Sequence, residues 1–437
     1  MKHPEFSLSR RQLLGGVAAT VALSSMATSA KNTKNTFSLP NSGNKSAVSL
    51  ATDEAFWREV ATHYERSEGI INLEHGYWGK MAKPVLDAYQ QATKMVNSQS
   101  SFYARKDFPH EMHHAMARVA QALGAQDGEI VLTRNATEAI HNLIRQYQGL
   151  TPGDAVLLAD SDYPSFKTAM QWLEQDQGVK SIELVTPALA NQAQLLQCYI
   201  DAFEQHPNIK LMLLTHVSNQ HGLVFPVKAI VAEANKRGID VICDCAQSWG
   251  LIDYKITDLQ VNWAGFNLHK WIGSPVGVGA LYMKKGTLEK IAPYPGESDP
   301  DNTHAYARVH MATSNFAAFM TVPAALDFHQ AIGGQNKEAR LKYLRNLWFS
   351  EAQTMSHIEL LGGKDTLSST GMSSFRLLGK TSLEDANKLQ QTLENDFGIF
   401  TVARKGLHSG ACVRITPQVY TAADEIYQLV DSLKKLA

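Results

Sequence analysis

The chain has 437 residues, enough for two domains, and its composition, with 44% hydrophobic and 19% charged residues, is that of a globular protein. Its formal net charge is -1, which favours neither nucleic acid nor an anionic membrane surface as a partner. A small-molecule ligand is the expectation that remains.

The first 30 residues have the order of a bacterial twin-arginine export signal. Arg10 and Arg11 precede a short apolar run over residues 15–26, and the small residues that end at Ala30 resemble a cleavage site. The alternative, a membrane anchor, is disfavoured because about 18–20 apolar residues are needed to span a bilayer. We therefore expect a periplasmic protein without a membrane segment in its mature form. Residues 31–50 are expected to form a flexible linker between the export signal and the folded part of the chain.

From about residue 121 onward, short apolar runs alternate with helical patterns. The predicted strands cover residues 130–133, 155–158, 211–215, 241–244, 263–266 and 279–282, and the predicted helices include 137–147, 166–176 and 227–237. This alternation predicts an α/β fold with a mostly parallel sheet that is covered on both faces. Ligands of such sheets bind beyond the carboxyl ends of the strands, so chemistry is expected there.

The pattern changes after residue 316. A long helical region over residues 320–355 leads to a strand at 373–378 and a final helix at 421–435. We therefore predict a large domain over residues 51–315, with an N-terminal arm over 51–80, and a smaller C-terminal α+β domain over 316–437.

Two predicted strand ends carry groups that suit an anion and a planar ligand. The helix that begins near Thr137 offers its hydroxyl and the backbone amide of Ala136 to a phosphate, although a simple capping box is an equally good interpretation. Tyr163 could stack on a planar cofactor, and Asn219 could donate to a phenolate oxygen. Each signal is weak by itself.

The next two strand ends carry the strongest chemistry. Asp244 ends an apolar strand, where a buried carboxylate needs a partner such as a protonated pyridine nitrogen, and Gln247 follows it. Lys270, after His269, lies among apolar neighbours that favour the neutral amine, the form that reacts with carbonyl groups. A lone lysine is usually a solvated surface charge, but its position after Asp244 argues otherwise.

These motifs resemble those of the class V, fold-type-I family of enzymes that use pyridoxal phosphate (PLP). Asn-Ala-Thr-Glu-Ala at 135–139, His-Val-Ser-Asn at 216–219, Asp-x-x-Gln at 244–247 and His-Lys at 269–270 occur in the family's order. The isopenicillin N epimerase-like branch and the cysteine desulfurases are the most similar, as is a periplasmic branch that tailors the siderophore pyoverdine. The resemblance implies a seven-stranded, mostly parallel sheet in the large domain.

The resemblance also implies roles for individual residues. Lys270 would form the Schiff base with PLP and move protons, and Asp244 would keep the pyridine nitrogen protonated so that a quinonoid intermediate can form. The implied cofactor-binding residues are Ala136, Thr137, Tyr163, Asn219, Asp244, Gln247, His269, Lys270 and Thr313. Thr313 would reach the phosphate of a neighbouring subunit, which implies a homodimer with shared active sites.

Three further residues are expected to contact the substrate. Arg414 resembles the family's carboxylate clamp, a bidentate role that lysine cannot fill. His75 and Tyr77 lie in a segment that resembles the family's entry to the active site. The segment 404–411 lacks the reactive cysteine of desulfurases, so desulfuration is not expected, and we interpret Cys198, Cys243, Cys245 and Cys412 as structural.

The expected activity is therefore a PLP enzyme that acts on an amino group next to a carboxylate, in an amino acid or in a peptide or siderophore precursor. It could be transaminase-like or siderophore-tailoring, with an epimerase, racemase or lyase as the alternative reaction. A ligand-binding protein that lost turnover is the alternative of another class. The His-Glu-x-x-His pattern at 110–114 is typical of zinc peptidases, but no third ligand follows and we predict no metal site.

Overall fold

The computed structural model describes residues 37–297 and 304–436. The predicted export signal lies outside the described residues. At the end of the predicted linker, helix α1 (Ala47–Ala51) buries Leu50 completely. The indole nitrogen of Trp57 in α2 (Glu54–Ala61) donates a 2.8 Å hydrogen bond to the Leu50 carbonyl.

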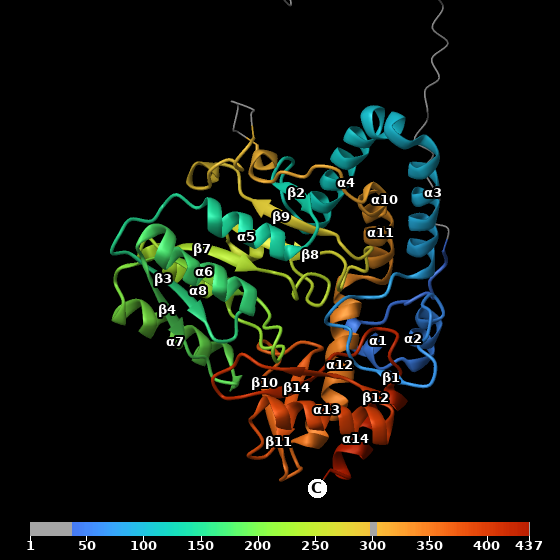
Figure 1. The fold of residues 1–437 in the computed structure, drawn as a ribbon. Helices are drawn as coiled ribbons and strands as arrows, with labels where there is room; N and C mark the ends of the chain where they lie inside the picture. The colour runs from blue at the N-terminus through green and yellow to red at the C-terminus, as the bar shows by residue number, and fades with distance from the viewer. Residues whose placement is uncertain (1–36, 298–303, 437) are drawn as a thin grey trace, which may run out of the picture. The chain divides into compact units, whose positions relative to one another are not determined.

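The larger sheet has seven strands in the order β2-β9-β8-β7-β6-β3-β4 (Figure 1). They are β2 (Ile130–Thr133), β3 (Ala155–Ala159), β4 (Lys180–Leu184), β6 (Ile209–Thr215), β7 (Asp240–Asp244), β8 (Trp263–Asn267) and β9 (Gly279–Met283). Strand β9 is antiparallel to both of its neighbours and every other pair is parallel. The mostly parallel α/β sheet predicted from the sequence is thus confirmed.

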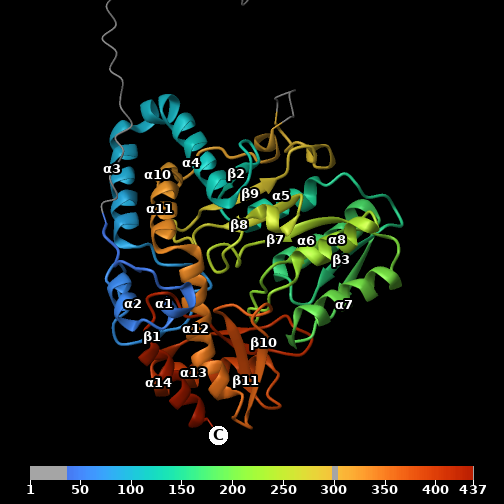
Figure 2. The ribbon, with the colours of Figure 1, turned by 180° about the vertical axis from the view of Figure 1, so that it is seen from behind.

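Alternate residues of these strands face two apolar layers. One face packs against α5 (Ala136–Gln146) and α6 (Pro164–Gln177). The other packs against α4 (Phe108–Leu123), α7 (Gln192–Gln205), α8 (Val227–Lys236) and α11 (Val322–Ile332), as the view from behind also shows (Figure 2). Both faces are covered because parallel strands need helical crossovers.

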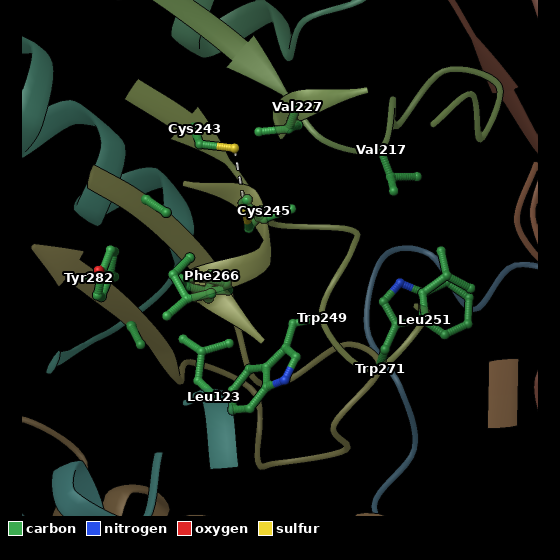
Figure 3. Packing of buried hydrophobic residues seen from close by; sticks show 14 of the residues in the cluster. Leu123, Val217, Val227, Cys243, Cys245, Trp249, Leu251, Phe266, Trp271 and Tyr282 are labelled. Carbon is green, nitrogen blue, oxygen red and sulfur yellow. Dashed lines mark hydrogen bonds between the residues drawn. The ribbon is translucent and has the colours of Figure 1, made fainter. Parts of the chain in front are cut away.

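The apolar layer behind β7 and β8 holds two of the cysteines. The sulfur atoms of Cys243 and Cys245 lie 3.6 Å apart among Trp249, Phe266 and Trp271 (Figure 3). All four cysteines are free thiols, and three of them are buried. This packing supplies the rigid base on which the ends of β7 and β8 are held.

A second sheet has the order β13-β14-β11-β10-β5. Its strands are β5 (Leu189–Ala190), β10 (Ile358–Gly363), β11 (Ser373–Leu377), β13 (Val402–Arg404) and β14 (Cys412–Ile415). They share an apolar core with α12 (Gly334–Ala352), α13 (Leu383–Phe397) and α14 (Ala423–Lys434). The apolar cores of the two sheets meet within α12. Leu341 belongs to the core of the seven-stranded sheet, and Leu344 belongs to the core of the five-stranded sheet. The domain boundary at residue 316 stays a prediction.

The long helical pattern at 320–355 forms two helices, because Gly333 separates α11 from α12 with a φ of +93°. The short helix α10 (Phe316–Met320) precedes them and packs beside α3 (Lys83–Lys106). Strand β1 (Ile71–Asn72) of the N-terminal arm pairs in parallel with β12 (Ile399–Phe400). Among the helices that the structure describes, none is long and apolar enough to cross a membrane.

Candidate functional site

A cavity of about 430 Å³ opens at the carboxyl ends of the parallel strands. We call it the strand-edge cavity. Its size lies within the range of roughly 300–1,000 Å³ that is usual for small-molecule sites. Its wall includes the predicted residues Tyr77, Ala136, Thr137, Tyr163, Asn219, Asp244, Gln247, His269 and Lys270. The sequence motifs therefore converge on one place.

The N-terminus of α5 forms one end of the strand-edge cavity. Asn135 caps the helix, with its side chain accepting a 2.8 Å hydrogen bond from the backbone N–H of Glu138. The backbone N–H of Ala136 donates to the Asn267 side chain at 2.8 Å, so it is already engaged. Thr137 faces the cavity at this positive helix end, where an anionic group is stabilised.

His269 lies on the same wall as a neutral imidazole. Its Nδ1 contacts the carbonyl of Val278 at 2.8 Å, which fixes the proton on Nδ1 and leaves Nε2 as the unengaged ring nitrogen. Burial lowers the pKa of His269 to about 4. The ring can therefore accept or donate a hydrogen bond without carrying charge at neutral pH.

The pKa shifts of Lys270 and Asp244 both favour the uncharged form of the side chain. Burial lowers the pKa of Lys270 to about 7, the charge of Arg414 adds to this shift, and Asp244 opposes it. Burial raises the pKa of Asp244 to about 6, although its side chain accepts a 2.8 Å hydrogen bond from the N–H of Ala246. A lysine with a low pKa is the nucleophile that carbonyl chemistry needs.

Tyr163 and Gln247 have different roles in the wall. Tyr163 is 38% exposed and lies 5.1 Å, edge to face, from the ring of Phe166. Gln247 is held on both sides of its amide, because it accepts from the indole N–H of Trp271 at 3.0 Å and donates to the Gly76 carbonyl at 2.8 Å. Gln247 therefore ties the N-terminal arm to the loop that carries Lys270.

The N-terminal arm contributes Gly76, Tyr77 and Trp78 to the wall of the cavity. The N–H of Gly79 donates to the His269 carbonyl at 2.9 Å. Tyr77 and Trp78 lie beside each other, with ring centroids 5.1 Å apart, and they are 69% and 47% exposed. The arm thus supplies an aromatic rim that includes Tyr77, a predicted substrate contact.

Arg414 and His75 do not line the strand-edge cavity, and their contacts with the substrate stay predictions. Arg414 is fully buried and donates to both carboxylate oxygens of Glu74, at 2.6 and 2.9 Å, and to the Asn219 carbonyl at 2.6 Å. Both terminal nitrogens of its guanidinium are thus engaged, whereas its Nε is buried without a hydrogen-bond partner. His75 is buried and its Nδ1 contacts the hydroxyl of Tyr420 at 3.2 Å.

Thr313 is exposed and lies outside the strand-edge cavity. Its predicted contact is to a neighbouring subunit, and it stays a prediction. Asn267 and Arg404 are among the wall residues that had no predicted role. Arg404 lies on β13, and its place beside the strand of Arg414 follows from a strand pairing that the sequence did not indicate.

The His-Glu-x-x-His pattern lies on α4. Glu111 accepts a 2.6 Å hydrogen bond from Tyr103, and His110, His113 and His114 are exposed. Within the described residues, no group of three or more His, Cys, Asp or Glu side chains is arranged to hold a metal ion.

Residues 79–429 match the model of the aminotransferase class-V family. The chain belongs to this family. It is 24% identical to the isopenicillin N epimerase of Amycolatopsis lactamdurans over 399 residues, which cover 87% of this chain and 98% of the epimerase. It is 25% identical to a probable cysteine desulfurase of Vibrio cholerae over 345 residues, 74% of this chain and 81% of that protein.

Solved structures show the same fold. A cystine C–S lyase in complex with its product cysteine persulfide superposes with a TM-score of 0.73 at 20% identity, covering 84% of this chain and 97% of the lyase. An apo cysteine desulfurase of Thermococcus onnurineus superposes with a TM-score of 0.72 at 20% identity, covering 84% and 94% of the two chains. The predicted fold-type-I architecture and PLP-dependent enzyme class are confirmed.

The residues of the strand-edge cavity fit PLP. The α5 N-terminus, Thr137 and the unengaged Nε2 of His269 suit its phosphate, and the Tyr163 ring suits its planar face. Asp244 is a buried carboxylate without a cationic hydrogen-bond partner among the described side chains, as expected where a ring N–H is to be bound. Lys270 lies on the same wall.

Proposed function

We propose that this chain is an exported PLP enzyme that acts on an amino group next to a carboxylate, in an amino acid or in a peptide or siderophore precursor. The reaction is transaminase-like or a siderophore-tailoring step. The observation that carries the proposal is that Lys270 and Asp244 share one cavity with the N-terminus of α5 and with His269.

The roles of the chain's own residues follow from their positions. PLP, when bound, supplies an electron sink for the bonds at the substrate's α-carbon. Lys270 holds the cofactor through Nζ and then moves a proton at that carbon. Asp244 keeps a proton at the ring nitrogen of the cofactor. Asp244 and Lys270 are both buried, and charge interactions with the cofactor are stronger in such surroundings than in water.

The rim of the cavity supports a substrate larger than a free amino acid. Tyr77, Trp78 and Val276 all line the cavity and are 69%, 47% and 62% exposed. Apolar side chains that gather at the mouth of a pocket mark a contact with a ligand or partner. A peptide or siderophore precursor would place its remaining groups against this rim.

The alternative reaction is an epimerisation or a lyase reaction. It is favoured by the likeness to isopenicillin N epimerases along nearly their whole length and by the fold shared with a cystine C–S lyase. Desulfuration through a chain cysteine is disfavoured, because Cys412 is buried outside the cavity and burial raises the pKa of its thiol to about 11.

We further propose a homodimer in the periplasm. The support for export is the twin-arginine pattern at Arg10 and Arg11, and the support for a dimer is the exposed position of Thr313. Size-exclusion chromatography with light scattering and fractionation of cells would test the two statements. A monomer, or a full-length cytoplasmic protein, would contradict them.

The reaction is tested by a spectral screen of the PLP-loaded protein. Amino acids, peptides and siderophore precursors are added in turn, the visible cofactor band is followed, and products are identified by mass spectrometry. We expect a band change followed by release of a product. That product has either lost its amino group or has the inverted configuration at the carbon that carries it. A lasting band change without product would instead identify a ligand-binding protein that keeps the fold without turnover.

A further inference from the structure

A second buried lysine supports the loop over residues 268–274, which carries Lys270 and which we call the lysine loop. Lys337, on α12, is 4% exposed and does not line the strand-edge cavity. Its Nζ donates a 2.6 Å hydrogen bond to the carbonyl of Trp271, the residue that directly follows Lys270. The contact therefore holds a backbone atom one residue away from Lys270.

The same nitrogen also reaches the end of α11. Lys337 lies in the first turn of α12, and its Nζ lies 3.0 Å from Nδ1 of His329 in the last turn of α11. Burial holds the pKa of His329 well below its ordinary value, so the imidazole carries no charge beside the lysine. One side chain thus joins two helices to the lysine loop.

Neither burial nor the helix favours a lysine at this position. Burial lowers the pKa of Lys337 to about 7, and no opposite charge among the described residues offsets this shift. The first turn of α12 is also the positive end of the helix dipole, where a cation is disfavoured. In return, Lys337 gains its hydrogen bond to Trp271 and its contact with His329. Strongly perturbed groups of this kind cluster at functional sites.

The lysine loop has two other supports, which come from different parts of the chain. The N–H of Gly79 in the N-terminal arm donates to the His269 carbonyl at 2.9 Å, and Gln247 after β7 accepts from the Trp271 indole at 3.0 Å. Lys337 adds a third support, from the helix in which the apolar cores of the two sheets meet. The backbone on both sides of the Lys270 side chain is therefore held.

We propose that Lys337 is a positioning residue for Lys270. By holding the Trp271 carbonyl, it fixes the backbone from which the Lys270 side chain enters the strand-edge cavity, and it makes that position depend on α12. The inference rests on the proposed function, since it concerns the lysine that is to hold PLP. Without this contact, the lysine loop should move and the Lys270 nitrogen should become more hydrated.

The first measurement is hydrogen exchange of the apoprotein, followed by mass spectrometry. Lys337→Met fills most of the same space without a donor. Relative to strands β6 and β7 of the same variant, exchange in the lysine loop should be about tenfold faster than in the parent, because a hydrogen bond is lost. The matched control is Lys342→Met on the same helix, which removes contacts with Glu338 and the Thr366 carbonyl and should leave the loop unchanged.

The second measurement is the pH profile of PLP uptake, which a purely structural residue would not move. In stopped flow, Lys337→Met should raise the pH midpoint of uptake by about one unit, toward the ordinary pKa of lysine, because the displaced Lys270 nitrogen is more hydrated. Lys342→Met should keep the midpoint of the parent. A raised midpoint with parental exchange in the lysine loop would show only the loss of a nearby charge and would overturn the inference, as would parental values of both.

Lys337→Gln keeps the test decisive if Lys337→Met does not fold. Its amide donor is on a shorter chain, so the contact lengthens and both changes are expected again, and parental values of both would contradict the inference. Failure of the proposed function is seen separately. Cofactor attached to a lysine other than Lys270 after borohydride reduction would refute that function, whereas exchange in the lysine loop of the apoprotein would still report on Lys337.

Discussion

Gly79 lies against the backbone of Lys270, and a Cβ atom at position 79 would stand 2.0 Å from the Lys270 carbonyl oxygen. The same glycine donates its N–H to the neighbouring carbonyl of His269 at 2.9 Å. No side chain fits in this space. The N-terminal arm is therefore a direct support of the loop that presents the lysine.

Gly79→Ala should push the arm away from this loop. Overpacking of this kind typically costs about 1–3 kcal/mol, and we expect that loss in urea unfolding together with weaker PLP retention on dialysis. Gly69→Ala is the control, because it meets no atom within 4 Å and only its φ of +72° resists a side chain. It should cost about 1–2 kcal/mol and leave PLP retention unchanged. Equal PLP loss in both variants would contradict the contact.

Lys270 should capture PLP at neutral pH. Its pKa is lowered to about 7, so the neutral amine that reacts forms as pH rises through 7 rather than through the ordinary value near 10.5. Stopped-flow uptake of PLP by the apoprotein should therefore rise with a midpoint near pH 7. Asp244→Asn removes a charge that raises this pKa, so the midpoint should move lower. A parent midpoint above pH 9 would contradict the buried environment.

Asp244→Asn should stabilise the apoprotein at neutral pH. The pKa of Asp244 rises from 3.8 to about 6 on folding, so folding takes up a proton and the stability of the parent falls as pH rises from about 4 to 6. Above pH 6 the variant should be more stable by about 3 kcal/mol, and the difference should vanish near pH 4. Urea unfolding of both apoproteins at several pH values measures this.

The same substitution should cost turnover once PLP is bound. Without the carboxylate, the ring nitrogen loses the group that keeps its proton, and preorganised charge of this kind is typically worth about 10²–10³ in rate. PLP itself should remain attached, which absorbance would show. A variant with near-parental turnover would remove Asp244 from the chemistry.

Cys412 should be chemically inert. It is buried, it does not line the strand-edge cavity, and burial raises its thiol pKa to about 11. Iodoacetamide should label it far more slowly than the partly exposed Cys198, by mass spectrometry of the folded protein. Cys412→Ser should also leave any C–S cleavage intact. Loss of such cleavage in this variant would indicate a desulfurase-like role.

The strand ends could be predicted because the chemistry is local to each of them. Asp244 closes an apolar run, and a run of that kind forms a strand whether or not its neighbours are known. Strand β4 was missed because it is an edge strand, exposed on part of its surface and interrupted by charges. The sequence-based expectations were weakest where partners lie far apart along the chain.

The pair of Glu74 and Arg414 shows this limit. The two residues are 340 positions apart, and nothing near either one predicts the other. A motif identified Arg414 as a cation of the site, but only the packing of the arm against β14 revealed that its charge is already matched. Arg404 was missed for the same reason, since its place on the cavity wall depends on the register of β13 with β14.

The central claim is that Lys270 carries PLP in the strand-edge cavity. The PLP-loaded protein is reduced with borohydride, digested, and searched by mass spectrometry for the cofactor mass on each lysine. We expect the reduced cofactor on Lys270, and Lys270→Ala should fold, lose the visible band of the parent and carry no label at that position. Stoichiometric label on another lysine of the parent, with Lys270 unmodified, would contradict the account.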